Sequence, residues 1–356
     1  MTASSISQLR LTNQHVHGTD FTSPKEVVHW MGAIQAQDYS MSKYAIGVRL
    51  KNVTNQIVED AINRGEIIRT HVLRPTWHLV AAEDIRWMLE LTANNINRLM
   101  ASNNKRLELD EKTFKKCNGI IEKLLRDGKH LTRKEIMAAL EKKGIPTNDL
   151  RASHIMFRAE TDLVVCNGSR REKQFTYALF DERVPSTKKK TKEEALAELA
   201  LRYSKSHGPA TVQDFGWWSG LSITDARAGL ESVKPYLISE KLKENEFWFW
   251  KETEHQKLKN NTIIFLPSYD EFLISYKSRH ISLDPQFAST TFTNNGIFNP
   301  IIVHNAKVIG IWKPDYKKEI SFKENFFIQP TEKQKQACVK AAKEFGSFMQ
   351  MKIAAP

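Results

Sequence analysis

The chain has 356 residues, with 53 Lys and Arg against 41 Asp and Glu and a formal net charge of +12. This length exceeds one ordinary hydrophobic core, so several domains or a modular array are expected. Hydrophobic residues make up 41% of the chain and charged residues 26%, which excludes a disordered protein. The positive charge favours a polyanionic partner, nucleic acid first; the alternative is a solubilising surface that meets no polyanion.

The cysteines and the apolar runs restrict the compartment. Cys117, Cys166 and Cys338 lie far apart and match no metal-ligand or disulfide spacing, which indicates a reducing environment. We therefore expect no structural metal and no cofactor. The N-terminal stretch "MTASSISQLRLTNQHV" lacks an apolar signal core, and no apolar run is long enough to span a bilayer. The sequence thus predicts a cytoplasmic protein with no membrane partner.

One local pattern occurs three times along the chain. A hydroxyl residue is followed three positions later by an acid and then by apolar residues at helical spacing, which predicts a capped helix start. These stretches are "SPKE" at 23–26, "TRKE" at 132–135 and "TVQD" at 211–214. A second amphipathic segment and a possible β-hairpin follow each of them.

The first copy predicts a helix from Pro24 to about Ile34 and a second helix closed by Gly65. Strand-like runs at 66–73 and 76–81 then flank Arg74 and Pro75. Helix, helix and β-hairpin in this order are typical of a winged helix.

In the middle copy, residues 131–145 predict the first helix, closed by Gly144, and residues 148–161 the second. A hairpin follows at 162–180, with Asn167-Gly168 as its expected turn. Several basic residues of this copy are candidates for phosphate contact, and ordinary solvation is the alternative for each. They are Arg151 and Arg158 on the second helix and Arg170, Arg171 and Lys173 at the wing tip.

The third copy predicts a helix at 222–236 and a short wing ending at 246–251. After about Asn260, strand-like runs predict a small β-barrel or curled sheet, before a terminal helix from about Glu332 to Met351. The sequence therefore predicts an α+β fold with three tandem winged helices and a β-barrel-like domain. Their expected bounds are 1–105, 106–190, 191–258 and 259–356. Such an array needs no partner subunit, so a monomer is expected.

Four segments carry a family resemblance. They are "IQAQD" at 34–38, "LRPTWHLV" at 73–80, "SHGPATVQDFGWWSGL" at 206–221 and "LPSYDEFLISYKSR" at 266–279. In this order, over nearly the whole chain, they resemble the winged-helix AlkZ-type DNA glycosylases. The resemblance implies three winged helices with a C-terminal β-barrel. It also implies excision of cationic N7-alkylated purines from double-stranded DNA and, in some members, unhooking of interstrand crosslinks.

The catalytic signature of that family is Gln, a hydrophobic residue and Gln, with Asp in place of the second Gln in another branch. Gln35 and Gln37 match the first branch. Asp38 lies one position beyond, so it receives no catalytic role. The resemblance therefore implies that Gln35 and Gln37 are the catalytic residues.

Two carboxamides suit this chemistry for a physical reason. Glycosidic hydrolysis usually requires an acid to protonate the leaving group, but a purine alkylated at N7 is already cationic and leaves as a neutral base. Our hypothesis is that Gln37 holds the attacking water and that Gln35 orients it or steadies the sugar-phosphate. No lysine nucleophile is indicated, so the product would be an abasic site.

The geometry of the motif sets a condition on this hypothesis. Residues two apart point to nearly opposite faces of a helix, so both glutamines serve one lesion only if the helix loosens by about Gln35. The alternative is that they cap helix carbonyls and a turn.

The other motifs supply further candidates. Arg74 would lie near phosphate at the first wing tip, and Thr76 or His78 near the site; alternatively, His78 is a strand histidine bound to a neighbouring backbone group. Lys277 and Arg279 are expected to follow the phosphates. Other polar and aromatic residues of these motifs are expected to be structural. Tyr269, Asp270 and Glu271 would form a polar cluster, and Trp217 and Trp218 would pack in the core rather than form a platform for DNA.

Three functions compete at this level. The first is a monofunctional DNA glycosylase for alkylated purines, and the second a DNA-binding regulator or architectural protein without catalysis. The third is an RNA-binding factor. Release of free 7-methylguanine from alkylated duplex separates them, because a regulator has no reason to liberate a base.

Overall fold

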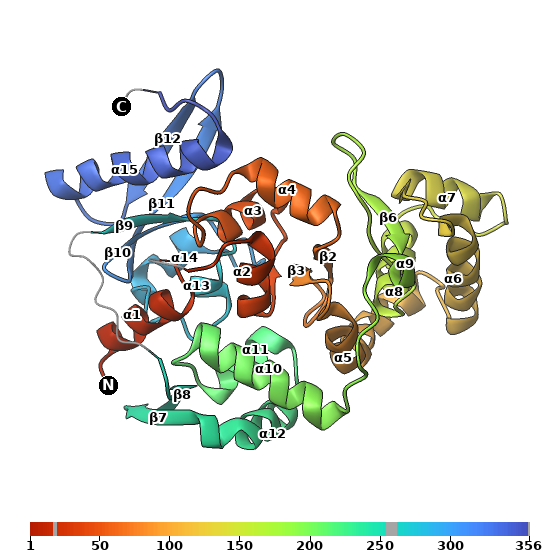
Figure 1. The fold of residues 1–356 in the computed structure, drawn as a ribbon, viewed down its shortest axis with the longest axis horizontal. Helices are drawn as coiled ribbons and strands as arrows, with labels where there is room; N and C mark the ends of the chain where they lie inside the picture. Colours follow the sequence, from red (N-terminus) through yellow and green to blue (C-terminus); the bar gives the residue numbers. More distant parts are fainter. Residues whose placement is uncertain (17–19, 254–261, 355–356) are drawn as a thin grey trace. The chain divides into compact units, whose positions relative to one another are not determined.

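The computed structural model describes residues 1–16, 20–253 and 262–354 (Figure 1). The domain boundary expected at 258–259 lies outside these residues. Contacts divide the chain into two compact units. Unit one contains Met1–Glu59, Leu196–Trp218 and Ser222–Pro356, and unit two contains Asp60–Ala195 and Ser219–Leu221. The expected division into four parts stays a prediction.

The N-terminal part of unit one differs from expectation in a way that matters for the glutamines. Its elements are α1 (Ala3–Asn13), α2 (Pro24–Met31), β1 (Ile34–Gln35) and α3 (Tyr39–Gly47). Helix α2 starts at the Ser23 cap as predicted but ends at Met31, three residues early, because Gly32 takes a φ of 74°. The following residues are extended, and α3 then begins at an Asp38 cap that the sequence pattern did not reveal.

Unit two contains the middle copy of the helix and hairpin pattern. Its elements are β2 (Ile67–His71), β3 (Trp77–Ala81), α5 (Ile85–Arg106), α6 (Glu111–Leu125), β4 (Leu131–Thr132), α7 (Arg133–Glu141), α8 (Arg151–Thr161), β5 (Val165–Asn167), β6 (Thr176–Leu179) and α9 (Phe180–Arg183). Helix α4 (Asn55–Asn63) leads into it from unit one. Thr132 and Glu135 form the predicted reciprocal cap of α7. Leucine, isoleucine and phenylalanine side chains of α6, α7 and α8 form the core.

The hairpin of this copy turns later than predicted. Asn167 continues the strand and pairs with Tyr177, and the N–H of Gly168 donates to the carbonyl of Thr176 at 2.8 Å. The reversal lies between Arg171 and Gln174 instead. Asn167 is retained in the strand because its side-chain oxygen accepts the N–H of Arg69 in β2, at 2.8 Å. A strong local turn signal thus yields to a contact with another strand.

The third copy also has the expected elements. Helix α10 (Lys192–His207) precedes α11 (Val212–Ser219), α12 (Ile223–Val233), η1 (Lys234–Tyr236), β7 (Leu237–Leu242) and β8 (Asn245–Trp250). Thr211 and Asp214 exchange the two cap hydrogen bonds of α11, each at 3.1 Å. Strands β7 and β8 form the antiparallel hairpin.

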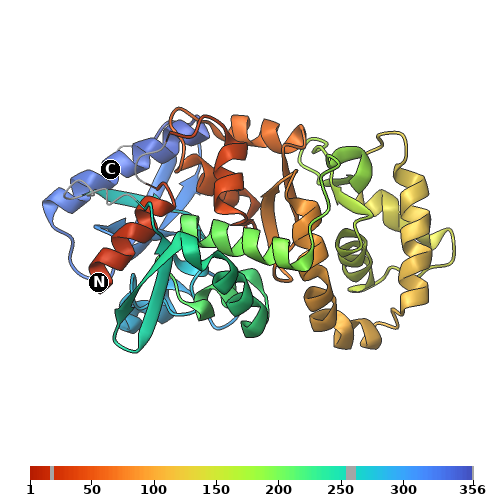
Figure 2. The ribbon, with the colours of Figure 1, turned by 60° about the horizontal axis from the view of Figure 1, so that its bottom comes forward.

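The C-terminal region is an open sheet rather than the expected β-barrel. Its elements are β9 (Ile263–Leu266), α13 (Glu271–Ile274), η2 (Pro285–Phe287), α14 (Ala288–Thr291), β10 (Ile301–His304), β11 (Lys307–Tyr316), β12 (Ile320–Phe326) and α15 (Glu332–Met349). Among the described residues the strands follow the order β12-β11-β10-β9 and do not close. Four strands are too few for a filled barrel, and α15 covers the sheet instead (Figures 1 and 2). Phe345 of α15 packs edge-on against Trp312 of β11, with ring centroids 5.1 Å apart. Within the parts of the chain that the structure describes, no helix has the length and apolarity needed to cross a bilayer.

Candidate active site

Helix α2 ends before the glutamine segment, as the catalytic hypothesis requires, and the convergence of both side chains on one lesion stays a prediction. Since α2 ends at Met31, Gln35 lies in an extended stretch, not in a helix. The Gln35 side chain is only 3% exposed, whereas Gln37 is exposed. The side-chain oxygen of Gln35 accepts the backbone N–H of Gln37 at 3.0 Å. Gln35 is therefore held inside the fold, and Gln37 is presented to solvent beside it.

Asp38 has a structural task. One of its carboxylate oxygens accepts the N–H of Met41 at 3.1 Å and caps α3. The other accepts the hydroxyl of Ser268 at 3.2 Å. Both oxygens are engaged, which agrees with leaving Asp38 out of the catalytic motif.

A buried carboxylate lies directly behind Gln35. Glu271, the first residue of α13, is completely buried, and its Oε1 accepts the backbone N–H of Gln35 at 2.6 Å. Its Oε2 accepts the hydroxyl of Ser275 and the indole N–H of Trp218 at 3.2 Å. The Nε2 of His207 lies 3.6 Å from the same oxygen. Three segments of the family resemblance therefore meet at one carboxylate.

These contacts shift the pKa values of Glu271 and His207. Burial by itself raises the pKa of Glu271, but the nearby His207 and the hydrogen bonds from Ser275 and the Gln35 backbone outweigh it and lower that pKa to about 2. Burial lowers the pKa of His207 below its ordinary value. At neutral pH Glu271 is therefore an anion.

The neighbouring acid is equally buried but has a different partner. Asp270 is 3% exposed and accepts two hydrogen bonds from the Arg49 guanidinium, at 2.9 and 3.0 Å. It also caps the N–H of Phe272 at 2.9 Å. Tyr269 is half-buried and packs against Phe298 instead. The expected polar cluster thus divides into a salt bridge at Asp270 and a support for Gln35 at Glu271, and only the folded chain reveals the latter.

The two adjacent tryptophans separate. Trp218 is fully buried, as predicted, whereas Trp217 is 41% exposed, so its expected place in the core is wrong. Trp217 stays ordered by donating its indole N–H to the Ile274 carbonyl at 2.9 Å. The guanidinium of Arg279 lies over its ring at 5.5 Å. A tryptophan that the helical pattern could not distinguish from its neighbour thus faces solvent beside a cation.

In unit two, the tip between β2 and β3 is tightly folded. Leu73 adopts a φ of 63°, and Arg74 and Thr76 each donate their N–H two residues back, at 2.7 Å. Gly220 packs against the Leu73 carbonyl so closely that a Cβ there would overlap it. His78 is fully buried, and its Nδ1 lies 2.9 Å from the Thr76 carbonyl. This is the backbone-bound histidine that the sequence left as an alternative, and a role in the site stays a prediction.

Comparison with known proteins decides the family. A family model described as "DNA glycosylase AlkZ-like" matches residues 28–348. The chain belongs to the AlkZ-like DNA glycosylases. It is therefore a hydrolase of N-glycosyl bonds, and the family resemblance found in the sequence is confirmed.

Two similar proteins from Streptomyces sahachiroi agree with the assignment to the AlkZ-like family. A protein named "Interstrand DNA cross-link repair glycosylase" is 24% identical over 331 residues, which cover 85% of each chain. The solved structure of DNA glycosylase AlkZ matches with a TM-score of 0.85 at 19% identity, over 99% of this chain and 98% of that one. The fold is thus shared over its full length.

Among the basic residues proposed for DNA contact in this AlkZ-like glycosylase, two already form hydrogen bonds within the protein. Arg158 donates to Glu111 twice and to Asp162 once, each at 2.7 Å. Arg151 donates to the carbonyls of Pro146 and Leu107. Both guanidinium groups therefore have structural partners, and phosphate contact by either stays a prediction.

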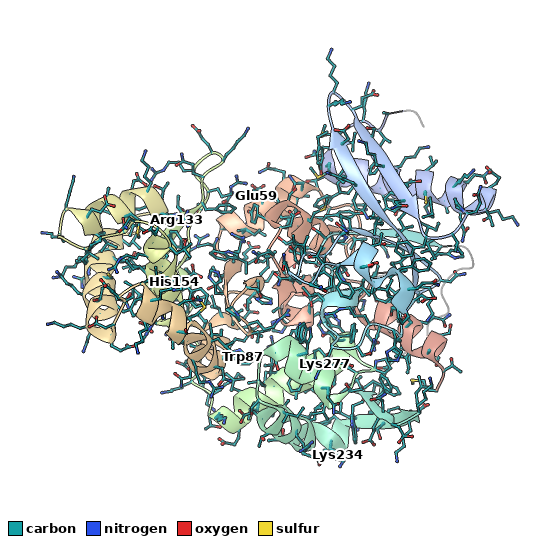
Figure 3. The ribbon with its side chains drawn as sticks, turned by 180° about the vertical axis from the view of Figure 1, so that it is seen from behind. Glu59, Trp87, Arg133, His154, Lys234 and Lys277 are labelled. Carbon is teal, nitrogen blue, oxygen red and sulfur yellow. The ribbon has the colours of Figure 1, made fainter. Side chains whose placement is uncertain are left out.

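The basic side chains at the wing tip of unit two differ in their exposure and in their partners. Arg171 pairs with Glu135 at 2.9 Å, and Arg170 donates to the Lys173 carbonyl at 2.8 Å. Lys173 itself is exposed near the turn. In unit one, Lys277 is exposed (Figure 3), while Arg279 donates to the Leu273 carbonyl at 3.1 Å. The side chains of Lys173 and Lys277 are thus exposed, and phosphate contact by either stays a prediction.

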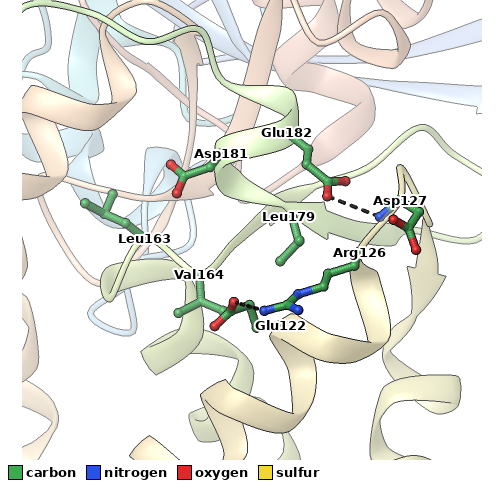
Figure 4. Close-up of a pocket in the computed structure, with 8 residues that line it drawn as sticks. All are labelled: Glu122, Arg126, Asp127, Leu163, Val164, Leu179, Asp181 and Glu182. Atoms are coloured by element: carbon green, nitrogen blue, oxygen red, sulfur yellow. Dashed lines mark hydrogen bonds and ion pairs between the residues drawn. The ribbon is translucent and has the colours of Figure 1, made fainter.

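One pocket of the glycosylase is too acidic to bind DNA. A pocket of about 460 Å³ in unit two is lined by four acids and one arginine (Figure 4). The Glu182 carboxylate accepts the N–H groups of Asp127 and Gly128. The charge of the pocket repels phosphate. Across residues 1–16, 20–253 and 262–354, no group of three or more His, Cys, Asp or Glu side chains is arranged to hold a metal ion.

Proposed function

We propose that this glycosylase hydrolyses the N-glycosidic bond of cationic N7-alkylated purines in double-stranded DNA, including purines held in interstrand crosslinks, and leaves an abasic site. Two observations support the proposal. The motif that matches the family's catalytic signature consists of two carboxamides, Gln35 and Gln37, and these suffice only for a leaving group that needs no protonation. The similar protein from Streptomyces sahachiroi is named for cross-link repair.

The observation that carries the proposal is the unequal placement of the two glutamines. The Gln35 side chain is only 3% exposed and its oxygen accepts the N–H of Gln37, so Gln35 supports the segment from which Gln37 projects. Gln37 is exposed, and its carbonyl can accept a hydrogen bond from the attacking water. Water adds to the sugar carbon, the base departs with the electron pair of the broken bond and becomes neutral, and the water proton passes to solvent.

We further infer that the three helix and hairpin copies are winged helices, that the protein acts as a monomer, and that their exposed basic side chains bind the phosphate backbone. The net charge of +12 supports this reading. A nucleic-acid partner also agrees with the exposed Lys173 and Lys277.

Base release tests the proposal. Purified protein is incubated with a duplex that carries one N7-methylguanine, and free base and abasic sites are measured. Wild-type protein should release the base, and Gln37→Ala should not. Tight binding of the duplex without release would refute the proposal and favour a DNA-binding regulator.

A further inference from the structure

The strongest unexplained feature is the buried charge at Glu271. A fully buried carboxylate is costly unless each oxygen receives donors. Its Oε2 faces Ser275, which follows α13 as its C-cap, Trp218 of α11 and His207 at the end of α10. Its Oε1 receives the N–H of Gln35, which is 236 residues away in the sequence. One side of the carboxylate is thus anchored in the scaffold of unit one, and the other holds the glutamine segment.

An ionised Glu271 holds the Gln35 backbone N–H more strongly than a neutral side chain would. Hydrogen bonds to an ionised acceptor are shorter and stronger than those to a neutral amide, and the contact to Gln35 is 2.6 Å. A neutral glutamine of the same length would still reach the N–H but would lose the charge. The side chains facing Glu271 are Ser275, Trp218 and His207, and the nearby Asp270 is already paired with Arg49.

The contact extends to the exposed glutamine. Glu271 fixes the peptide of Gln35, and the Gln35 side chain accepts the N–H of Gln37 at 3.0 Å. A shift of the Gln35 peptide therefore moves the backbone from which Gln37 projects. Placement errors of about 1 Å are enough to slow an oriented reaction roughly 100-fold.

We propose that Glu271 is a positioning residue for excision: its carboxylate fixes the Gln35 backbone, and through Gln35 it sets the place of Gln37. The proposal rests on the proposed function, because it assigns the orienting of water to the glutamine pair. Glu271 itself touches neither the lesion nor the water.

The test separates positioning from folding. Glu271→Gln keeps the length of the side chain, and Glu271→Asp keeps its charge but shortens its reach. Single-turnover release from the N7-methylguanine duplex gives a rate constant and an amplitude for each variant. A folding defect lowers the amplitude, because fewer molecules are active. A positioning defect lowers the rate constant of the active molecules and leaves the Kd for the duplex within about twofold. We expect rate constants at least about tenfold below wild type for both variants.

Asp270→Asn is the matched control, because Asp270 is the adjacent buried acid but pairs with Arg49. It should reduce stability and amplitude while the rate constant stays near that of wild type. Wild-type rate constants in Glu271→Gln and Glu271→Asp, or an equal fall in Asp270→Asn, would overturn the positioning role. Absence of base release by the wild-type protein would instead refute the proposed function.

Discussion

Gln37 donates its backbone N–H to the side-chain oxygen of Gln35, at 3.0 Å. The two residues of the motif are therefore not equivalent: one is a buried support and the other an exposed side chain. This relationship leads directly to a prediction on activity.

Gln37→Ala should lower the rate of base release at least about 100-fold, because the water loses its oriented acceptor. Duplex binding and the melting temperature should change little, since Gln37 is exposed. Gln336→Ala, which removes an exposed glutamine of α15, is the control and should behave as wild type. Near-normal release by Gln37→Ala in single-turnover assays would rule out its role.

The adjacent tryptophans should differ sharply in their effect on stability. Trp218→Ala removes a fully buried ring and a hydrogen bond to Glu271, so the free energy of unfolding should fall by about 3–5 kcal/mol. Trp217→Ala removes a ring that is 41% exposed and should cost about 1 kcal/mol. Denaturant unfolding measures both changes, and equal losses would contradict the separation of these side chains.

Two glycines of unit two with positive φ should respond unequally to alanine. Gly144 has a φ of 73° with open space around it, so Gly144→Ala should cost about 1 kcal/mol of backbone strain. Gly220 has a φ of 69° and contacts the Leu73 carbonyl. Gly220→Ala should therefore cost more, and it should displace the tip that carries Arg74. Thermal unfolding and duplex affinity test this; a duplex affinity unchanged by Gly220→Ala would show that the tip is not used.

The candidates for DNA contact can be separated by salt dependence. Lys173→Ala should reduce the slope of log K against log salt by about one, because one phosphate contact is lost. Arg158→Ala should leave the slope unchanged and lower stability by about 1 kcal/mol, since its guanidinium binds Glu111 and Asp162. The reverse pattern in binding titrations would place Arg158 on the DNA instead.

Acid should weaken the fold through Glu271. Its pKa lies at about 2 in the folded protein, below the ordinary 4.5, so its stabilising contribution is present above about pH 4.5 and is lost as the pH falls towards 2. The shift corresponds to on the order of 3 kcal/mol. The difference in unfolding free energy between wild type and Glu271→Gln should shrink as the pH falls below about 4.5. A constant difference down to pH 3 would show that folding does not lower the pKa of Glu271.

Local signals predicted much of the fold. The helix starts at Ser23, Thr132 and Thr211 depend on hydrogen bonds to a residue three positions away, so the pattern that encodes them is contiguous in the sequence. The hairpin pairing β2 with β3 and the helix α15 also follow from short periodic stretches. The order of the four motifs was enough to indicate the family.

Tertiary structure decided the rest. The hairpin turns later than Asn167-Gly168 because the Asn167 side chain binds the strand β2. The C-terminal sheet stays open because four strands are too few for a filled barrel. Trp217 is exposed, whereas Trp218 is buried. The role of Glu271 also depends on the folded chain, since its hydrogen bond joins residues 236 positions apart. Capping and turn chemistry act between neighbours, whereas the partner of a buried charge is chosen only when distant segments pack together and exclude water.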